Sequence, residues 1–213
     1  TEMSPLGTTN FPTPEMDEMP DEEKYALQVK AGRPVFGVEM KIVDDKGATL
    51  PNDGVAYGRL LVRGPWIIKK YFKSEESAVD ADNWFDTGDI SSIDPDGYMA
   101  IVDREKDVIK SGGEWISSID LENVIANHPD VLQTAVVGIP HPKWDERPLL
   151  FIVSNSGNEF DRSELDDLML EKFEKWQLPD DVVFLKELPI GATGKVKKID
   201  LRQEYTDHYM KEA

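Results

Sequence analysis

The sequence contains no cysteine, which excludes disulfide bonds, zinc–thiolate sites, iron–sulfur clusters and thiol catalysis. Basic residues are few, since 24 Lys and Arg stand against 42 Asp and Glu and give a formal net charge of −18. Because such a surface repels phosphate backbones, we exclude a non-specific nucleic-acid binder, while local basic sites stay open. Long apolar runs are also absent, and stretches such as Leu149–Val153 are far too short to span a membrane.

What is present is typical of a globular protein. The chain has 213 residues, of which 39% are apolar, and this is too apolar for a fully disordered protein. Its length suits one large domain or two small ones. The first residue is Thr1 rather than methionine, and no signal-peptide pattern follows. We therefore expect a piece of a longer protein.

The first half of the chain reads as an acidic connector followed by short strands. Residues 1–23 hold seven acidic residues and no basic residue, and Pro12, Pro14 and Pro20 interrupt the stretch, so we expect an exposed loop. From Pro34 to about Val102, strands at residues 38–43, 58–64 and 98–102 are separated by turns at 45–47 and 94–97. This pattern predicts a small barrel or sandwich.

After Arg104 strands and helices alternate. Ser117 is expected to cap a helix that runs toward His128, and Asp161 with Glu164 predicts the capping box of a second helix. The other expected elements are an apolar helical stripe that ends at Trp176, strands at 131–139, 149–153 and 182–185, and a polar helix from about Ile199. We therefore predict two units that meet near residues 103–107.

Residues 84–89, Trp-Phe-Asp-Thr-Gly-Asp, form the first segment that could carry chemistry. They could be a turn that ends a strand, with Asp89 capping backbone amides. Alternatively, a carboxylate at a turn can accept hydrogen bonds from both vicinal hydroxyls of a ribose.

Residues 103–116 combine alternating charges with a Gly-Gly turn. They could be a simple hairpin with solvated flanks. In the functional alternative, Gly112 and Gly113 allow a ligand to approach the backbone closely, and Arg104 offers a fork for phosphate or ribose oxygens. A charged stretch between two units is also a natural place for a hinge.

Two later segments are ambiguous in the same way. Residues 137–148 predict a rigid connection between two strands because prolines lie at both ends, and the lone His141 is more often structural than catalytic. Residues 188–198 contain Gly-x-x-Gly-Lys, whose spacing is wrong for a phosphate-binding loop. They are either a loop with solvated lysines or a flexible arm that delivers Lys195 to an anionic centre.

In this order, the segments resemble the adenylate-forming superfamily of acyl-CoA synthetases, luciferases and peptide-synthetase adenylation domains. Thr1-Glu2-Met3-Ser4-Pro5 is similar to the end of the family's Tyr-Gly-x-Thr-Glu motif, with its first residues missing. The other matches are residues 32–44 with the next conserved block, 84–89 with the ribose-binding aspartate motif, 103–116 with the hinge and glycine loop, and Gly194-Lys195 with the catalytic lysine motif. Residues 115–122 and 141–148 are most similar to the medium-chain acyl-CoA ligase group, in the branch that contains methylmercaptopropionyl-CoA ligase.

The resemblance implies an ATP-dependent carboxylic acid–CoA ligase. Such an enzyme forms an acyl-adenylate with release of pyrophosphate and then a CoA thioester with release of AMP, here on a short- or medium-chain acid such as methylmercaptopropionate. By matching position, Thr1 would contact phosphate, Glu2 would ligate Mg²⁺, and Asp89 would bind the ribose with help from Arg104. Lys106 would be the pivot, and Gly112, Gly113 and Trp115 would line the CoA passage. Lys195 would neutralise the charge that develops in adenylation.

The implied fold class is α+β. Residues 1–103 would be the end of the large N-terminal domain, an acidic loop plus a small β-barrel subdomain, and residues 104–213 a compact α/β lid domain with a hinge near 103–107. The missing N-terminal part of the same chain would hold the acyl pocket and the triphosphate grip. The covered part alone is therefore expected to be inactive.

Several points stay open at this stage. Arg59, Lys70-Tyr71 and Asp145 depart from residues common in the family, which weakens any fine choice of substrate. One alternative is a non-catalytic binding or regulatory module that keeps the lid fold. Another is an adenylation enzyme with a carrier-protein thiol or oxygen as acceptor. The expected location is cytoplasmic, and a homodimer is compatible with the sequence.

Overall fold

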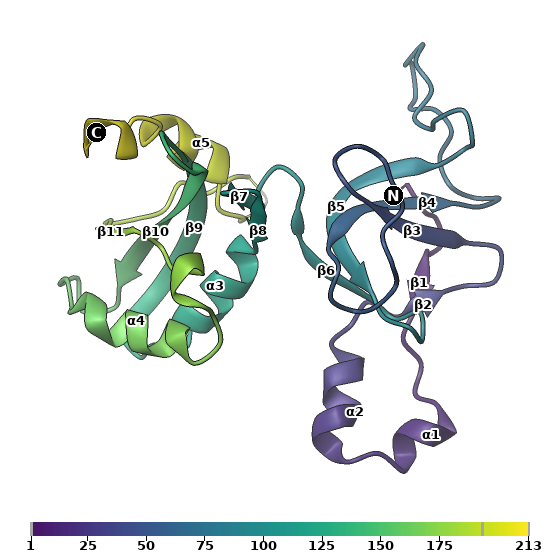
Figure 1. The fold of residues 1–213 in the computed structure, drawn as a ribbon, viewed down its shortest axis with the longest axis horizontal. Coiled ribbons are helices and arrows are strands. Elements are labelled where there is room, and N and C mark those ends of the chain that lie inside the picture. Colours follow the sequence, from purple (N-terminus) through teal and green to yellow (C-terminus); the bar gives the residue numbers. More distant parts are fainter. Residues whose placement is uncertain (1, 193, 213) are drawn as a thin grey trace. The chain divides into compact units, whose positions relative to one another are not determined.

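The computed structural model describes residues 2–192 and 194–212. The chain divides into two compact units, Thr1–Glu105 and Lys106–Ala213, and each is treated separately below (Figure 1). The division falls inside residues 103–107, the stretch in which the sequence places a hinge. None of the helices built from the described residues has the length and apolar character needed to span a bilayer.

The first unit is built on a four-stranded antiparallel sheet. Its strands are β3 (Glu39–Val43), β4 (Gly58–Arg63), β5 (Phe85–Ile93) and β6 (Met99–Arg104), and they are neighbours in that order. Alternate residues point to the core, so that in β4 the side chains of Leu60 and Val62 are buried and those between them are not. The predicted strands are thus confirmed.

This sheet is open in the described residues. β3 and β6 form its two ends and do not pair with one another, so no closed barrel is found there. A four-stranded barrel would leave little room for interior side chains, and small barrels typically need about eight strands. The apolar face is instead covered by loop residues packed against the core, including Met3, Trp66 and Val79.

The acidic N-terminal stretch is not simply a loop. The strands β1 (Thr8–Thr9) and β2 (Arg33–Pro34) pair with each other, and the helices α1 (Pro14–Asp17) and α2 (Asp21–Gln28) project between them (Figure 1). The expectation of a loop is wrong at these helices. Proline at the start of α1 and acidic residues in both first turns stabilise helix N-termini, because these ends carry partial positive charge.

The second unit is a five-stranded sheet with helices on both faces. β10 (Asp145–Ser154) lies between β9 (Val131–His141), antiparallel, and β11 (Asp181–Phe184), parallel, and it touches the hairpin of β7 (Ile109–Ser111) and β8 (Glu114–Ile116) at Asp145. The helices are α3 (Ser118–Ile125), α4 (Arg162–Leu170) and α5 (Lys198–Glu204), with 3₁₀ turns η1 (Lys175–Gln177) and η2 (Tyr209–Glu212).

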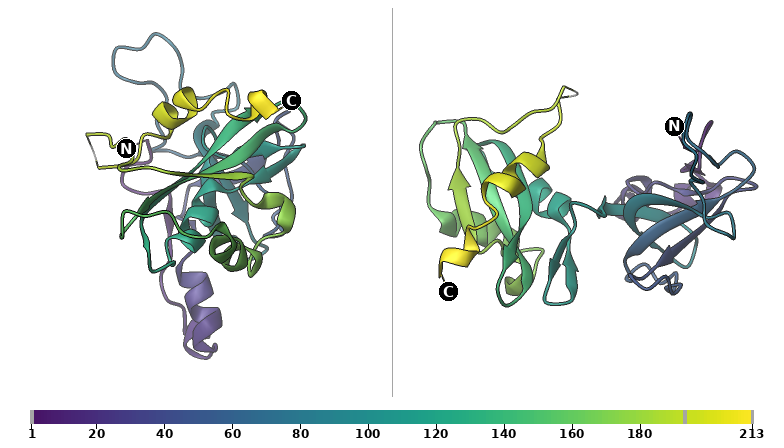
Figure 2. Two further views of the ribbon diagram at one scale, coloured as in Figure 1. Left: turned by 90° about the vertical axis from the view of Figure 1, so that its left-hand side faces the viewer. Right: turned by 90° about the horizontal axis from the view of Figure 1, so that it is seen from above.

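The two faces of this sheet carry separate cores. Leu150 and Ile152 of β10 pack on the side of α3 and α4, whereas Leu149 and Phe151 pack on the side of α5. The left view of Figure 2 shows α4 and the yellow α5 on opposite sides of the sheet. Burial on both faces explains why residues 149–153 form an unbroken apolar run rather than an alternating one. The structure is a mixed α/β fold.

Ser117 and Asp161 are the caps of α3 and α4, as predicted, but the predicted capping box of Asp161 with Glu164 is not the arrangement that forms, and helix lengths differ. Ser117 Oγ accepts from Asp120 N at 3.1 Å, and the helix ends at Ile125, before His128. Asp161 Oδ1 accepts from Ser163 N at 2.9 Å. The Glu164 carboxylate lies 3.3 Å from His128 Nε2, a contact between residues distant in the sequence. The helix α4 ends at Leu170, and Trp176, which the sequence assigned to the same helical stripe, belongs to the 3₁₀ turn η1.

The interpretation of residues 137–148 as a loop is also wrong. β9 and β10 pair as far as His141 and Asp145, so only residues 142–144 turn. Pro140 and Pro148 lie within the strands, opposite Glu146 and Gly138. Opposed residues in an antiparallel pair of strands alternate between hydrogen-bonded and non-hydrogen-bonded pairs. The two proline pairs are two positions apart and are therefore of the same kind, so both prolines can occupy non-hydrogen-bonded pairs, where no N–H donor is needed.

Candidate functional site

Asp89 and Arg104 form an ion pair on adjacent strands of the first unit. The two residues are opposite each other in β5 and β6, and Arg104 Nε lies 3.0 Å from Asp89 Oδ1. The Asp89 side chain is 17% exposed and that of Arg104 58%. The segment 84–89 therefore does not end a strand, as one interpretation had it, because Phe85 begins β5. A mostly buried carboxylate beside an exposed guanidinium can accept hydrogen bonds from the two hydroxyls of a diol.

Burial raises the pKa of the Asp89 carboxyl, and the nearby Arg104 guanidinium opposes that rise. Thr87 Oγ1 accepts from Asp89 N at 3.1 Å and donates to Leu60 O at 3.1 Å, which fixes this part of β5 to the neighbouring strand β4. Arg104 thus favours the ionised form of this carboxylate, and an ionised carboxylate can accept hydrogen bonds on both oxygens.

Arg104→Leu is expected to raise the pKa of Asp89 further, because burial would then act without the opposing cation. The carboxylate would consequently be protonated, and lost as an acceptor, at a higher pH than in the parent protein. Carboxyl ¹³C chemical shifts followed through a pH titration measure this change. Arg63→Leu, which removes a guanidinium paired with Glu39 instead, is the matched control. An unchanged Asp89 titration in Arg104→Leu would contradict the assignment.

The part of β5 that contains Asp89 is tied to the end of the first unit. Gly88 has φ +69°, its N–H donates to Asp86 Oδ1 at 3.0 Å, and its carbonyl accepts from Glu105 N at 3.0 Å. Arg59 Nη1 lies 2.7 Å from Asp86 Oδ2, and Arg59 Nε lies 3.9 Å from Glu105 Oε1. Arg59, one of the departures noted from sequence, thus bridges the first half of β5 and the last residue of the unit.

Glu2 lies beside residues 67–71, and Thr1 lies outside the described residues. Tyr71 OH donates to Glu2 Oε1 at 3.3 Å, and Glu2 O accepts from Ile68 N at 2.9 Å. In the part of the chain that the structure describes, no group of three or more His, Asp or Glu residues could hold a metal ion. Mg²⁺ in nucleotide sites is bound by one or two carboxylates together with phosphate oxygens and water, so one carboxylate at Glu2 fits.

In the second unit, Gly112 and Gly113 form the turn between β7 and β8. Their φ angles are +61° and +90°, values that side chains rarely adopt. Gly112 N donates to Trp144 O at 2.9 Å, and a Cβ added at Gly112 would lie 3.0 Å from Trp144 Cε3. A Cβ at Gly113 would meet nothing within 4 Å. The first glycine is therefore required by backbone angle and packing together, and the second by backbone angle.

Gly112→Ala is expected to destabilise the protein more than Gly157→Ala. Gly157 has a similar φ of +72° but open space around it, so alanine there carries only the backbone strain, about 1–2 kcal/mol. At Gly112 the Trp144 ring must also shift, which adds about 1 kcal/mol. Calorimetric unfolding of both variants measures the difference. Equal losses would show that the ring moves freely.

A pocket of about 380 Å³ opens beside this turn. It is lined by Ser111, Gly112, Glu114, Trp144, Arg147, Trp176 and Asp180. Trp144 and Trp176 are 41% and 45% exposed, which is unusual for such large apolar side chains. Two exposed indoles and a bare backbone turn suit a planar ring as ligand.

The sequence missed both indoles of the pocket. Trp144 was read as part of a rigid connection, and Trp176 as part of a helical core stripe; their exposure is a tertiary property. Trp115, which the sequence assigned to the CoA passage, neighbours the pocket residue Glu114 on β8. Successive residues of a strand face opposite sides, and on its own side Trp115 lies under Lys110, with Nζ 5.5 Å from the ring centroid.

Lys195 lies in a loop closed at its base. Ile190 and Val196 form a bridge, and Gly191 N donates to Lys195 O at 2.7 Å. The nearby Lys197 and Lys198 have carboxylate partners, Asp200 at 3.4 Å and Glu122 at 2.7 Å. Within the described residues, the exposed Lys195 side chain has no ion-pair partner. It is therefore the cation of this cluster that is available to an external anion.

Lys106 is exposed in a turn over residues 105–107, between β6 and β7. The expected site residues are thus divided between the units. Glu2, Asp89 and Arg104 belong to the first, and Lys106, Gly112, Gly113, Trp115 and Lys195 belong to the second.

Comparison with known families finds two matches along the chain. The family model described as "AMP-binding enzyme" matches residues 1–72, and the one described as "AMP-binding enzyme C-terminal domain" matches residues 120–195. The two models describe successive parts of one kind of enzyme, and here they occur in the same order.

Individual relatives point the same way. The chain is 53% identical over 206 residues to 3-methylmercaptopropionyl-CoA ligase of Ruegeria lacuscaerulensis, and 46% identical over 207 residues to medium-chain-fatty-acid–CoA ligase of Ectopseudomonas oleovorans; each match covers 97% of this chain and 38% of the relative. Among solved structures, o-succinylbenzoate CoA synthetase of Bacillus subtilis, in complex with its acyl-adenylate intermediate, matches with a TM-score of 0.74 and 31% identity, over 86% of this chain and 37% of that one. The chain therefore spans well under half the length of these relatives.

Proposed function

The chain belongs to the AMP-binding enzyme family, and we propose that it is the C-terminal portion of an ATP-dependent carboxylic acid–CoA ligase. The resemblance inferred from the order of the motifs is confirmed by the two family models. The observation that carries the proposal is the Asp89–Arg104 pair, which places a carboxylate and a guanidinium 3.0 Å apart at the position matched to the ribose-binding motif.

In the proposed adenylation step, each charged residue has a separate task. Asp89 accepts both ribose hydroxyls of ATP, and Arg104 favours the ionised form of that carboxylate and adds a donor toward ribose or phosphate oxygen. Glu2 is the carboxylate that would hold Mg²⁺, which when bound supplies positive charge to the phosphates. Lys195 neutralises the charge that builds between the substrate carboxylate and the α-phosphate in the transition state.

In the proposed second step, the CoA thiol displaces AMP. Gly112 and Gly113 present backbone without side chains, so a narrow pantetheine arm can pass close to them. The pocket beside Gly112 supports CoA over a carrier-protein thiol, because CoA ends in an adenine that two indoles can stack against. Stacking of a base on an aromatic side chain contributes about 1–3 kcal/mol.

The proposed substrate is a short- or medium-chain acid such as methylmercaptopropionate. Support comes from the 53% identity with 3-methylmercaptopropionyl-CoA ligase, which extends over 97% of this chain. The proposed acyl pocket lies in the part of such enzymes that this chain does not span.

The finer domain description belongs to the same proposal. Residues 1–103 would be the end of the large adenylation domain and residues 104–213 a lid, with Lys106 as pivot. The exposed Lys106, in a turn between β6 and β7, supports this place for a pivot, because hinges commonly lie in short loops that absorb a change of backbone angle. A homodimer and a cytoplasmic location stay predictions.

The test uses the full-length enzyme with MgATP and a panel of short, medium and sulfur-containing acids. Release of pyrophosphate without CoA reports adenylation, and release of AMP after adding CoA or a phosphopantetheinylated carrier protein reports the acceptor. We expect AMP release with CoA. Absence of pyrophosphate with every acid would favour the non-catalytic binding module, and AMP release only with carrier protein would change the acceptor.

A further inference from the structure

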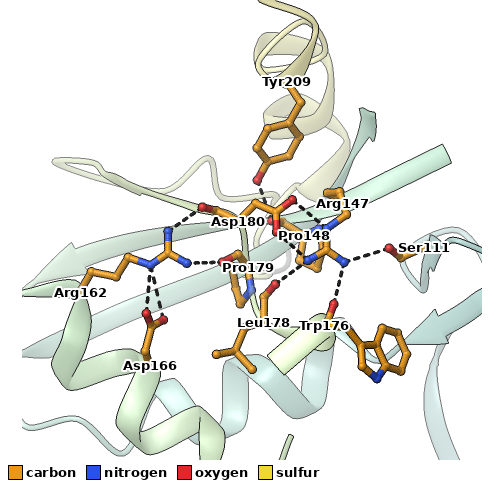
Figure 3. A network of polar contacts seen from close by, with 10 residues as sticks. All are labelled: Ser111, Arg147, Pro148, Arg162, Asp166, Trp176, Leu178, Pro179, Asp180 and Tyr209. Carbon is orange, nitrogen blue, oxygen red and sulfur yellow. Dashed lines mark hydrogen bonds and ion pairs between the residues drawn. The ribbon is translucent and has the colours of Figure 1, made fainter. Parts of the chain in front are cut away.

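Arg147 is a buried arginine whose guanidinium is fully used. It is 7% exposed, and its Nε and Nη2 hold the two oxygens of Asp180 at 2.8 and 2.6 Å. Nη1 donates to Ser111 Oγ at 2.9 Å and to Trp176 O at 2.7 Å, and Nη2 also donates to Leu178 O at 3.0 Å (Figure 3). A planar fork with five donors is the group that can satisfy so many acceptors at once.

These bonds join parts of the chain that are distant in sequence. Arg147 belongs to β10, Ser111 ends β7, and residues 176–180 are the segment that leads into β11. The carbonyls of that segment are held by side chains, and Figure 3 shows a second guanidinium, Arg162, directed at it from the other side. Arg162 donates to Pro179 O and to Asp180 O, both at 2.6 Å. Only Arg147 of the two also reaches the β7–β8 hairpin.

The residues that Arg147 joins line one pocket. Ser111 precedes Gly112, and both line the pocket together with Trp176 and Asp180. The main chain of Trp176 is held through its carbonyl, at 2.7 Å from Arg147 Nη1, and the same nitrogen donates to Ser111. One nitrogen atom therefore ties the main chain of Trp176 to the residue that precedes the glycine turn.

We propose that Arg147 is a positioning residue for the thioester step, because it fixes Trp176 relative to the Gly112 turn and so sets the width of the pocket that receives the planar end of CoA. The inference rests on the proposed function, since it names the residue that shapes the acceptor site of that reaction. It assigns no role to Arg147 in adenylation.

The kinetic test compares Arg147→Met with Arg162→Met in the full-length enzyme. Arg162→Met removes two bonds to the same segment but none to the hairpin or to Trp176, and so it is the matched control. We expect Arg147→Met to raise the KM for CoA about tenfold or more while pyrophosphate release without CoA stays within twofold of the parent. Arg162→Met is expected to leave the KM for CoA within twofold. Arg147→Lys should rescue only partly, because an ammonium cannot make the bidentate bond.

Two further readouts separate positioning from a general loss of structure. In a Trp176→Ala background, Arg147→Met is expected to add little to the KM for CoA, because both changes remove the same wall. Amide hydrogen exchange is expected to accelerate in residues 109–114 and 174–181 of Arg147→Met, but only in 174–181 of Arg162→Met. If Arg147→Met does not fold, Ser111→Ala decides, since it cuts only the bond to the hairpin; a rise of about threefold in the KM for CoA is expected.

An unchanged KM for CoA in the folded variants, with the parent forming thioester, would overturn the inference. Unchanged exchange in residues 109–114 would overturn it too, because the two walls would then not be coupled. If the parent forms no thioester at all, the proposed function fails instead, and hydrogen exchange still tests the coupling of the walls.

Discussion

Lys195→Ala in the full-length enzyme is expected to lower the rate of acyl-adenylate formation about a thousandfold. Lys195 is exposed at the end of a loop closed by the Ile190–Val196 bridge, and in the described residues it has no ion-pair partner. Removing one group that stabilises developing charge typically costs about 10²–10³ in rate, or roughly 3–4 kcal/mol. Thioester formation from pre-made acyl-adenylate should be spared. Pyrophosphate release and AMP release, measured separately, give the two rates.

Lys197→Ala is the matched control for this prediction. It removes a lysine two positions along, in the same loop region, but this lysine lies 3.4 Å from Asp200 in an exposed pair of little energetic weight. We expect less than a threefold change in either half-reaction. If Lys195→Ala slowed both half-reactions equally, or if the two variants behaved alike, Lys195 would not be the residue that acts in adenylation.

Asp89→Ala is expected to lower kcat/KM for ATP at least about 100-fold. Two hydrogen bonds from ribose hydroxyls to a charged acceptor contribute roughly 1.5–3 kcal/mol each. The fold should tolerate the change, because the partner left behind, Arg104, is 58% exposed and can be hydrated. The decisive measurement is the ratio of kcat/KM for ATP to that for 2′-deoxy-ATP. The parent should discriminate between them, and the variant should lose most of that discrimination.

Asp86→Asn tests whether the effect belongs to one carboxylate. Asp86 lies three residues away in the same strand, and asparagine retains an oxygen to accept from Gly88 N while losing the charge that faces Arg59. We expect the discrimination against 2′-deoxy-ATP to persist in this variant. Should Asp86→Asn remove it, or should Asp89→Ala retain it, the ribose contact would have to be reassigned.

Local chemistry predicted much of the secondary structure. Ser117 and Asp161 were identified as helix caps from residue type and spacing, and both side chains accept a backbone N–H of the first helical turn. The capping box predicted for Asp161 and Glu164 was wrong, because Asp161 accepts from Ser163 N and Glu164 lies 3.3 Å from His128 Nε2. β3 was predicted from the alternation of residues 38–43, because the period of a strand is two residues, and β4 was predicted as a short strand between two glycines. Where prolines and acids suggested only a loop, the helices α1 and α2 form, since the same residues also favour helix N-termini.

The candidate site was predicted in part. Residue type and motif order singled out Asp89, Arg104, Gly112 and Lys195, and the structure adds that Asp89 and Arg104 are paired and that Trp144 packs against the Gly112 turn. Trp176 and the Arg147 network could not be foreseen, because no local pattern distinguishes an exposed indole or a buried arginine from ordinary ones. Their environments come from segments more than 25 residues apart.

The amino-acid sequence alone was sufficient to exclude thiol chemistry, to identify the family and the motif residues, and to place the two helix caps and several of the strands. Each of these depends on residue type and on spacing along the chain, which are local quantities. Three features followed from tertiary packing alone. Within the described residues, Lys195 lacks the ion-pair partner that Lys197 and Lys198 have. Trp144 and Trp176 line a pocket, and the Arg147 guanidinium joins two segments of its lining. Burial and pairing arise from strands and loops distant in sequence, and their free energy exists only once those segments pack together.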